Sequence, residues 1–393
     1  MKRIRKYLRI SFAFLFICLD SVINGQPNSL NTSFIIDIKR NIENVKALNL
    51  STIGEDLLYI PLETTPKCLI QYIKKVELTD LFIFISEGTR LLQFDSKGNF
   101  IRQIGAAGRG PEEYLSVGDF CTDDQKKEIY IISAPKLLVF GFDGVFKYSK
   151  NLSFRPAQIL LKDQDNLMFH LFNMPGKSFA NDYSWIITDK QGTILISIKN
   201  HLKRTSQPGL IVMDTPLYSF QKNTHFLEFG IDTLYYFQDN KKKPYAIFNL
   251  EDLKMDPDPL ITRITKEDVG KKLFNKFWIN AIYENNDYLF VKFSRGITDS
   301  TMHAIFDKKT AEVTILKDNV FRNDIDGGLN YWPMQIVNDK ILINYMDAFD
   351  LLKSIKKMQS ESKTKKGKNV PTKLSNLSKQ LTETSNPVLV ILK

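Results

Sequence analysis

Short apolar runs separated by turn residues dominate the chain from residue 57 onward. The first of these runs cover residues 57–60, 76–78, 81–85, 91–94 and 100–104. Runs of this length, rich in β-branched and aromatic residues, are typical of β-strands. Apolar positions at helical spacing are scarce, and the same pattern continues through residues 129–148 and 166–198. The chain therefore predicts an all-β fold.

The clearest internal repeat is a tight turn that begins with an aspartate. Such turns follow apolar runs at Asp95, Asp143, Asp189 and Asp307. The carboxylate caps backbone N–H groups of the turn, and a nearby glycine accepts the positive φ that closes a hairpin. Successive aspartates lie 48, 46 and then 118 residues apart, and the last step spans two units. The resulting period of about 46 to 59 residues is typical of a repeat array.

Four strands per unit at this period predict a six-bladed β-propeller, in which closure of the ring hides the sheet edges. A pair of β-sandwiches is the alternative, but it leaves the recurring hairpin unexplained. We place the propeller at 57–393 and a lead-in segment at 26–56. The expected blades cover 70–105, 117–152, 156–200, 218–255, 278–320 and 329–393.

The last unit contains the least regular stretch of the chain. After the strand at 340–345 the sequence becomes rich in Lys and Ser, over 353–381, before a final apolar run at 387–392. An early strand, either 57–60 or 34–38, is expected to complete the sheet that contains this run and so latch the two ends together. We expect the Lys-rich insertion to be a solvated helix and loop, with binding to an anionic surface as the alternative.

The N-terminus has the pattern of an export signal. A basic segment precedes an uninterrupted apolar run at 10–19, which is too short to span a bilayer. Ile23 and Gly25 suit a signal-peptidase site, so residues 1–25 are expected to be removed. Lipidation at Cys18 is the alternative, although a bulky residue precedes this cysteine where a lipobox has a small one. No other run is long enough to form a transmembrane helix.

Composition and charge exclude two classes of protein. Hydrophobic residues make up 43% of the chain and aromatic residues 12%, far more than disordered chains carry. The net charge of +10 is concentrated, with +4 in residues 1–25 and +8 in 353–381, which leaves −2 on the remainder. The body of the protein is therefore not basic, and we expect no nucleic-acid partner.

The Gly-rich segment 105–111 is the first candidate ligand site. It lacks the Gly-Lys-[Ser/Thr] ending of a phosphate-binding loop, and a tight crossover between blades is the favoured interpretation. In a ligand role, Arg109 would supply a forked donor for a carboxylate or phosphate, with Glu112 and Glu113 beside it. Tyr114 would supply a stacking surface for a sugar or a peptide.

The tryptophans are candidate sugar platforms. Trp185 lies within an apolar run and is expected in the core, and Trp278 is a further candidate. Tyr331 and Trp332 follow a Gly-Gly turn and form a candidate exposed pair, with packing in the core as the favoured alternative.

No combination of residues predicts a cofactor, a metal ion or a catalytic centre. The histidines fall in different parts of the units: His170, His201, His225 and His303. Their spacing matches no metal site. The acidic pairs at 123–124 and 163–165 lack a calcium-loop pattern and are expected to be solvated turns. Cys68 and Cys121 form no C-x-x-C pair, so two semi-buried thiols are favoured over a disulfide.

Four segments resemble the exported six-bladed β-propellers that are abundant in Bacteroidetes and are related in pattern to NHL-type propellers. These segments are 59–65, 100–114, 326–333 and 386–390. The resemblance implies a periplasmic, secreted or outer-membrane-associated propeller without an established substrate. We expect a non-catalytic binding module for a glycan, a peptide or an envelope protein. The alternative is a lyase or glycan-active hydrolase with its site in the central channel.

Overall fold

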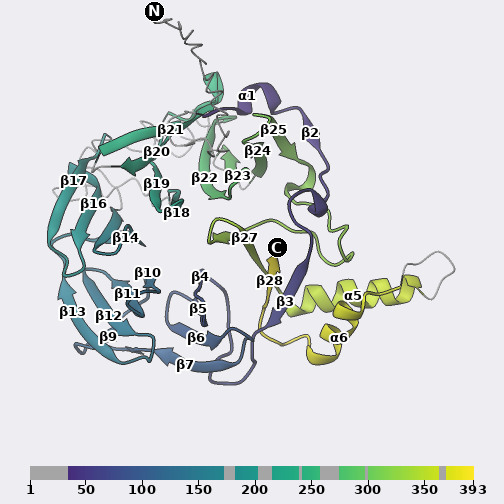
Figure 1. The fold of residues 1–393 in the computed structure, drawn as a ribbon, viewed down its shortest axis with the longest axis horizontal. Helices are drawn as coiled ribbons and strands as arrows, with labels where there is room; N and C mark the ends of the chain where they lie inside the picture. Colours follow the sequence, from purple (N-terminus) through teal and green to yellow (C-terminus); the bar gives the residue numbers. More distant parts are fainter. Residues whose placement is uncertain are drawn as a thin grey trace, which may run out of the picture. The chain divides into compact units, whose positions relative to one another are not determined.

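Six sheets form a ring in the computed structural model, as Figure 1 shows. The structure describes residues 34–171, 182–201, 215–238, 241–256, 274–296, 300–362 and 369–393. These residues belong to a single compact unit, Ser33–Lys393. The expected six-bladed propeller is therefore confirmed. The expected signal peptide at 1–25 and the candidate lipidation site Cys18 lie outside the described residues.

The first three blades each contain four antiparallel strands, which follow the chain order from the inside of the ring outward (Figure 1). Blade 1 consists of β4 (Lys75–Leu78), β5 (Phe82–Ser86), β6 (Leu91–Asp95) and β7 (Phe100–Ile104). Blade 2 consists of β10 (Asp119–Asp123), β11 (Glu128–Ser133), β12 (Lys136–Gly141) and β13 (Phe146–Asn151). Blade 3 consists of β14 (Pro156–Leu161), β15 (Asn166–Leu171), β16 (Tyr183–Asp189) and β17 (Ile194–Lys199).

The other three blades each include a strand from the N-terminal part of the chain. Blade 4 consists of β18 (Leu217–Phe220), β19 (Asn223–Leu227), β20 (Thr233–Gln238), β21 (Lys241–Asn249) and the early strand β1 (Phe34–Asp37). Blade 5 consists of β22 (Phe277–Glu284), β23 (Tyr288–Arg295), β24 (Ser300–Asp307), β25 (Val313–Leu316) and the early strand β2 (Val45–Lys46). Blade 6 consists of β26 (Gln335–Val337), β27 (Ile341–Met346), β28 (Val388–Leu392) and the early strand β3 (Leu57–Pro61).

The two ends of the chain meet in blade 6. Strand β3 pairs antiparallel with β28, with Leu57 opposite Leu392. Of the two early segments that the sequence offered for this closure, 57–61 therefore makes it, whereas β1 pairs parallel with β21 in blade 4. Asn386 reinforces the closure, because its Oδ1 accepts a hydrogen bond from the Ile70 N–H at 2.7 Å. Closure thus covers a sheet edge that would otherwise stay unpaired.

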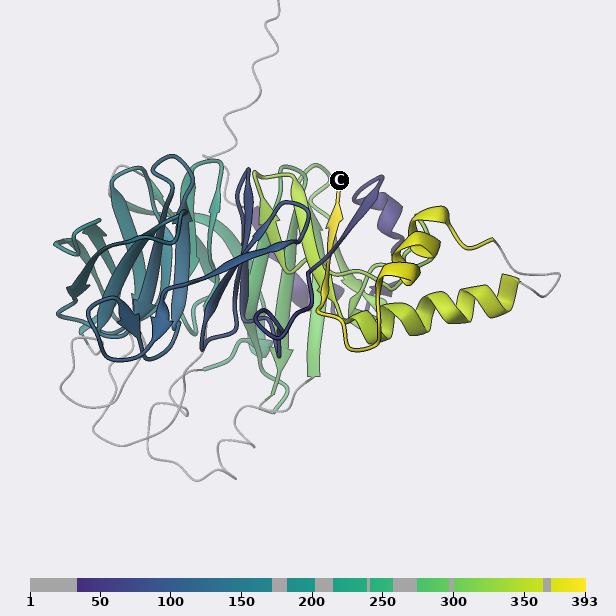
Figure 2. The same cartoon turned by 90° about the horizontal axis from the view of Figure 1, so that it is seen from below.

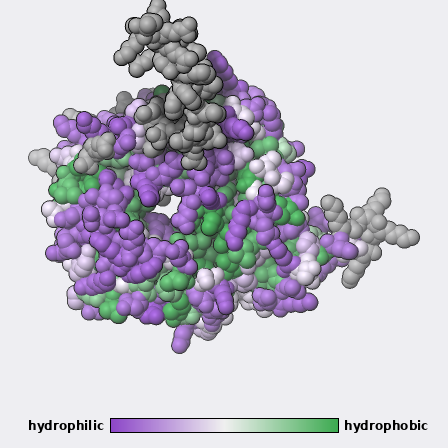
Figure 3. Space-filling view, viewed as in Figure 1, coloured by the Kyte–Doolittle hydropathy of each residue, from purple (hydrophilic) through white to green (hydrophobic). Residues whose placement is uncertain are grey.

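The propeller has two faces, which are seen from the side in Figure 2. On the turn face, short turns join the first strand of a blade to the second and, in blades 1, 2, 3 and 5, the third to the fourth. On the loop face lie the described connections from the second strand to the third and from one blade to the next. Figure 3 shows hydrophilic residues gathered around a hollow near the centre of the ring.

The aspartate turns of the repeat lie on the turn face and have the expected geometry. In each, the aspartate Oδ1 accepts a hydrogen bond from the N–H two residues later, at 2.8 to 3.0 Å. Three of the turns contain a glycine with positive φ: Gly98, Gly144 and Gly192. A local capping pattern therefore repeats in space as it does in sequence.

The Lys-rich insertion forms two helices, α5 (Ala348–Ser362) and α6 (Thr372–Gln380), which project from blade 6 in both Figure 1 and Figure 2. Leu351, Ile355 and Leu374 anchor them in a hydrophobic cluster shared with blades 5 and 6. The basic segment 363–368 between them lies outside the described residues. Within the described part of the chain, no helix has both the length and the apolar character needed to cross a membrane.

Candidate functional site

A cavity of about 380 Å³ opens on the loop face between blades 4 and 5. We call it the mouth, and its lining consists of His201, Gly230, Ile231, Lys254, Met255 and Asp256. It adjoins a smaller space of about 20 Å³, the throat, which shares four of these residues: Gly230, Ile231, Lys254 and Met255. The throat is further lined by Thr215, Leu227, Phe229, Leu250, Phe277, Trp278 and Ile279. A mainly apolar lining with a few polar groups is typical of small-molecule sites.

Two chain connections build this cavity. The connection between β19 and β20 turns sharply at Gly230, whose φ of 76° is easily adopted only by glycine. The connection from blade 4 to blade 5 is held against β22, because the Met255 N–H donates to the Phe277 carbonyl oxygen at 3.1 Å. Backbone hydrogen bonds therefore fix both walls.

A buried carboxylate, Glu228, organises the charges beside the cavity. Only 4% of the residue is exposed, and it accepts hydrogen bonds from His201 Nδ1 at 2.9 Å and Lys242 Nζ at 2.8 Å. Burial acts to raise the pKa of Glu228, but the bonds from His201 and Lys242 outweigh it and hold the pKa below its usual value. Glu228 is therefore ionised, and both of its carboxylate oxygens accept hydrogen bonds.

The basic side chains around the cavity also have partners. The Nε2 atom of His201 lies 3.0 Å from the Phe229 carbonyl oxygen, so both ring nitrogens of His201 face acceptors. Lys254 Nζ lies 2.9 Å from Asp232 Oδ2. Each of these described side chains is therefore paired.

Two residues that line the throat each carry a buried polar side-chain atom for which the structure shows no hydrogen-bond partner: Thr215 Oγ1 and Trp278 Nε1. Thr215 is 4% exposed, and its backbone is held in place because its carbonyl oxygen accepts a hydrogen bond from Gln158 Nε2 at 3.2 Å. Buried polar groups are normally paired, so each such exception calls for an explanation.

The histidines do not come together in one site. His170 lies in β15 and His225 in β19, and burial lowers the pKa of both, to about 4 for His170. His303 lies in β24 and stacks on Trp332, with ring centroids 3.9 Å apart. Across the described ranges, no group of three or more His, Cys, Asp or Glu is arranged to hold a metal ion.

The segment 105–114 is a crossover between β7 and β10. It contains a small parallel pair, β8 (Ala106–Ala107) with β9 (Glu113–Tyr114). Glu113 closes the loop by accepting a hydrogen bond from the Gly110 N–H at 2.7 Å. Tyr114 is 1% exposed, and its hydroxyl donates to the Ile104 carbonyl oxygen at 2.9 Å, so its ring offers no face to a ligand. Of the four candidates in this segment, Arg109 and Glu112 are the exposed ones.

The candidate pair Tyr331 and Trp332 lies in the core between blades 5 and 6. Tyr331 is 0% exposed and Trp332 is 7% exposed. His303 and Phe321 stack on Trp332, which leaves no platform for a sugar. This pair and the 105–114 segment belong to different interfaces between blades and do not form one site.

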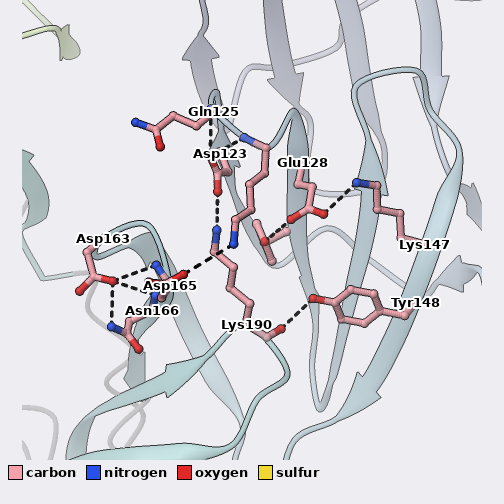
Figure 4. Close-up of polar contacts among 11 residues, drawn as sticks. Asp123, Gln125, Glu128, Lys147, Tyr148, Asp163, Asp165, Asn166 and Lys190 are labelled. Carbon is pink, nitrogen blue, oxygen red and sulfur yellow. Dashed lines mark hydrogen bonds and ion pairs between the residues drawn. The ribbon is translucent and has the colours of Figure 1, made fainter.

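A second polar cluster joins blades 2 and 3 on the turn face, and Figure 4 shows it. The Lys190 ammonium group pairs with the Asp123 carboxylate, and the Tyr148 hydroxyl donates to the Lys190 carbonyl oxygen at 2.8 Å. Asp123 is 3% exposed, which corrects the expectation of a solvated turn at this residue. Its partner lies 67 residues away in sequence, so no local pattern indicates the pair. These groups satisfy one another and hold two blades together.

The two free thiols of the described residues lie in the core. Cys68 and Cys121 are buried, and neither forms a disulfide. Burial raises the pKa of the Cys121 thiol, which disfavours the reactive thiolate. The two cysteines therefore behave as small core residues.

Comparisons with known proteins identify the family and support the fold, but they assign no role to the cavity. The family model described as a domain of unknown function, DUF4934, matches residues 33–393. A Bacteroides fragilis protein, named as an exported protein, has a crystal structure that is 20% identical, with a TM-score of 0.69 over 92% of this chain and 99% of that chain. A DUF4221 family member from Bacteroides vulgatus is 12% identical, with a TM-score of 0.44 over 67% of this chain and 84% of its own. No curated protein matches.

Proposed function

The chain belongs to the DUF4934 family, and we propose that it is an exported, non-catalytic binding module whose partner enters the loop-face cavity. The observation that carries the proposal is the cavity itself, because its described lining combines apolar side chains such as Ile231 and Met255 with a few polar groups. A lining of this kind around a space of about 380 Å³ is typical of small-molecule sites.

The state of Glu228 favours binding over catalysis at this site. A general acid or base has to gain or lose a proton near neutral pH. Hydrogen bonds from His201 and Lys242 hold the pKa of Glu228 below its usual value, and both ring nitrogens of His201 face acceptors. These groups shape the cavity and are poorly placed to transfer protons.

The partner classes remain those that the sequence predicts: a glycan, a peptide or an envelope protein. Arg109 and Glu112 are exposed on the same loop face, so a large partner would meet them as a second contact area. Export is supported by the N-terminal pattern of residues 1–25 and by the name of the similar Bacteroides fragilis protein.

The proposal is tested by screening the mature chain, from residue 26, against glycan and peptide arrays. Ile231→Arg places a charged side chain in the mouth, and we expect it to weaken binding of any hit at least tenfold. Val145→Arg is the matched control, because Val145 is 59% exposed and lies on the turn face. Equal binding by both variants would place the partner elsewhere, and an absence of hits on both arrays would contradict the proposal.

A further inference from the structure

We infer that the exposed side of α5 binds an anionic phospholipid surface and so holds the propeller at a membrane of the envelope. This role is separate from the loop-face cavity and does not depend on a ligand there. Three observations carry it: the helical insertion is additional to the blade repeat, its outer side gathers lysines around an aromatic ring, and the ion pairs of these lysines are exposed.

The helical insertion is an addition to the repeat. The connection from the second strand of a blade to the third covers only residues 87–90 in blade 1 and 134–135 in blade 2, whereas in blade 6 it covers 347–387. Ring closure itself is made by the pairing of β28 with β27 and β3. Both helices project from the ring in Figures 1 and 2. A projecting element that closure does not require points to a separate role.

Helix α5 has a buried side and a basic side. The buried side packs in the hydrophobic cluster shared with blades 5 and 6. Phe349, Lys353 and Lys356 follow one another at intervals of four and three residues, which places them on one face of the helix, and Lys357 lies beside them. The three lysines are exposed, and Phe349 is 49% exposed. We call these four residues the basic stripe.

The lysines of the basic stripe are available to a new partner. Lys356 Nζ lies 2.8 Å from Glu383, and Lys357 Nζ lies 3.9 Å from Glu361. All four of these side chains are more than half exposed, and such pairs contribute little to stability. Among the described residues, no carboxylate lies within ion-pair distance of Lys353. Phosphate groups can therefore replace the carboxylates at small cost.

The distribution of charge along the chain favours an anionic surface. Residues 353–381 carry a net charge of +8, whereas the chain outside this stretch and outside residues 1–25 carries −2. Four of the nine lysines fall in 363–368, outside the described residues, so the surface is defined on α5 alone. Lysines near an anionic membrane are attracted to it, whereas the rest of the protein is not. The attraction would thus turn α5 toward the membrane.

The exposed ring of Phe349 favours a bilayer over a soluble polyanion. Helices that bind membrane surfaces place lysines and aromatic rings on the same side, since the ammonium groups meet the phosphates while the ring enters the apolar layer below them. A soluble polyanion would engage the lysines and leave the ring without an apolar contact. The stripe also runs along one projecting helix, a convex surface that suits a flat partner (Figure 2).

The experiment measures co-sedimentation of the mature chain, from residue 26, with vesicles of mixed phosphatidylglycerol and phosphatidylcholine. We expect binding to these vesicles, and loss of binding in high salt or with pure phosphatidylcholine. The triple variant Lys353→Gln, Lys356→Gln, Lys357→Gln should weaken binding about 100-fold, or about fivefold for each lysine. Phe349→Ser should weaken it roughly fivefold, because part of the apolar contact is lost. Circular dichroism checks that each variant is folded.

A matched control separates the basic stripe from net charge. The triple variant Lys97→Gln, Lys126→Gln, Lys150→Gln removes the same charge from exposed positions in blades 1 and 2. It should bind the mixed vesicles nearly as well as the native chain. Ile231→Arg, in the mouth of the cavity, should also leave vesicle binding intact. The membrane role and the cavity function are therefore tested independently.

Each other outcome overturns the inference. Equal weakening by the two triple variants would mean that net charge alone attracts the protein. Binding to pure phosphatidylcholine as strong as to the mixed vesicles, or no binding to either, would exclude recognition of anionic lipid. Polyglutamate is the remaining comparison. If it binds and the stripe variant abolishes that binding while vesicles do not bind, the stripe docks an acidic protein instead.

Discussion

Two interfaces of the ring, one between blades 2 and 3 and one between blades 4 and 5, use the same turn position in different ways. Lys190 and Lys308 each follow the aspartate of a repeat turn, in blades 3 and 5. Lys190 crosses to Asp123 of the preceding blade. Lys308 pairs with Glu284 of its own blade, 2.6 Å away, and reaches the preceding blade through the ring of Phe220, whose centroid lies 3.9 Å from its Nζ. The same residue in the repeat therefore forms its ion pair between two blades in one place and within a single blade in the other.

At the second interface, tyrosines provide the link between the blades. Tyr218 and Tyr245 of blade 4 both donate their hydroxyl groups to Glu284, the first at 2.6 Å. At the loop-face end, the same interface contains the cavity. The interface between blades 2 and 3 is filled by a hydrophobic cluster that includes Phe154 and Phe169. The comparison indicates that a repeat fold can leave a cavity at one of its interfaces when polar links replace part of the apolar packing.

The largest expected effect comes from Glu284→Ala. The Glu284 side chain is 0% exposed, and its loss leaves Lys308, whose side chain is 11% exposed, without a counter-charge. Breaking a buried pair from one side typically costs about 3–5 kcal/mol. Urea unfolding of this variant should show a loss of that size. The control is Glu383→Ala, which removes an exposed partner of Lys356 and should cost no more than about 1 kcal/mol. Equal losses would mean that Glu284 contributes no more than a surface group.

Lys190→Met tests the other interface, and we expect a smaller loss of about 2–3 kcal/mol. The loss is smaller because Asp123 keeps hydrogen bonds from the N–H groups of Gln125 and Lys126, each at 3.0 Å. The double variant Lys190→Met, Asp123→Asn should recover part of the loss, since no charge is then left unpaired. A double variant that is less stable than Lys190→Met would show that the pair is not the reason for the loss.

Two tyrosine variants compare the strength of the hydrogen bonds that cross the two interfaces. Tyr218→Phe removes a hydrogen bond to a carboxylate, and Tyr148→Phe removes one to a backbone carbonyl group. Bonds to charged groups contribute about 1.5–3 kcal/mol, and neutral ones about 0.5–1.5 kcal/mol. Chemical denaturation should therefore rank Tyr218→Phe as the more damaging. The reverse order would contradict the view that the bond to the Glu284 carboxyl group is the stronger of the two links.

The smallest effect is a pH dependence at the interface of blades 2 and 3. Burial acts to raise the pKa of Asp123, but its bond with Lys190 dominates and holds the pKa below the usual value. The stabilising contribution is therefore complete above the unfolded pKa of about 3.9 and disappears as the pH falls through the lower folded pKa. The stability difference between the native chain and Asp123→Asn should stay constant from pH 7 to 5 and narrow below about pH 4. Narrowing above pH 5 would point to another group.

The fold could be predicted because its signals are local and repeated. Asp95 and its equivalents cap their own turns, so a few neighbouring residues determine each hairpin, and the spacing counts the blades. The closing strand at 57–61 was one of two alternatives, because no local sequence pattern shows which distant strand a segment pairs with. The parallel pairing of β1 with blade 4 was not anticipated for the same reason.

The site could not be predicted in the same way. Its residues come from segments that are distant in sequence: connections at His201, Gly230 and Lys254, and the strand β22 at Trp278. Tyr114 and Trp332 were chosen for their residue type, but aromatic rings next to turns in a propeller also fill the spaces between blades, as these two do. Trp278 was named as a candidate platform, and its place at the cavity follows only from the neighbouring connections.

Strand β3 determines when the ring can be completed. Strand β3 is made early, yet its partner β28 lies at the far end of the chain, so blade 6 cannot form until residues 388–392 have been synthesised. The strands β1, β2 and β3 join the sheets of blades 4, 5 and 6, so this early segment spans three consecutive blades. A pulling force applied at residue 34 would first break the parallel β1–β21 pairing, then the β2–β25 pairing in blade 5, and last the β3–β28 pairing that closes the ring.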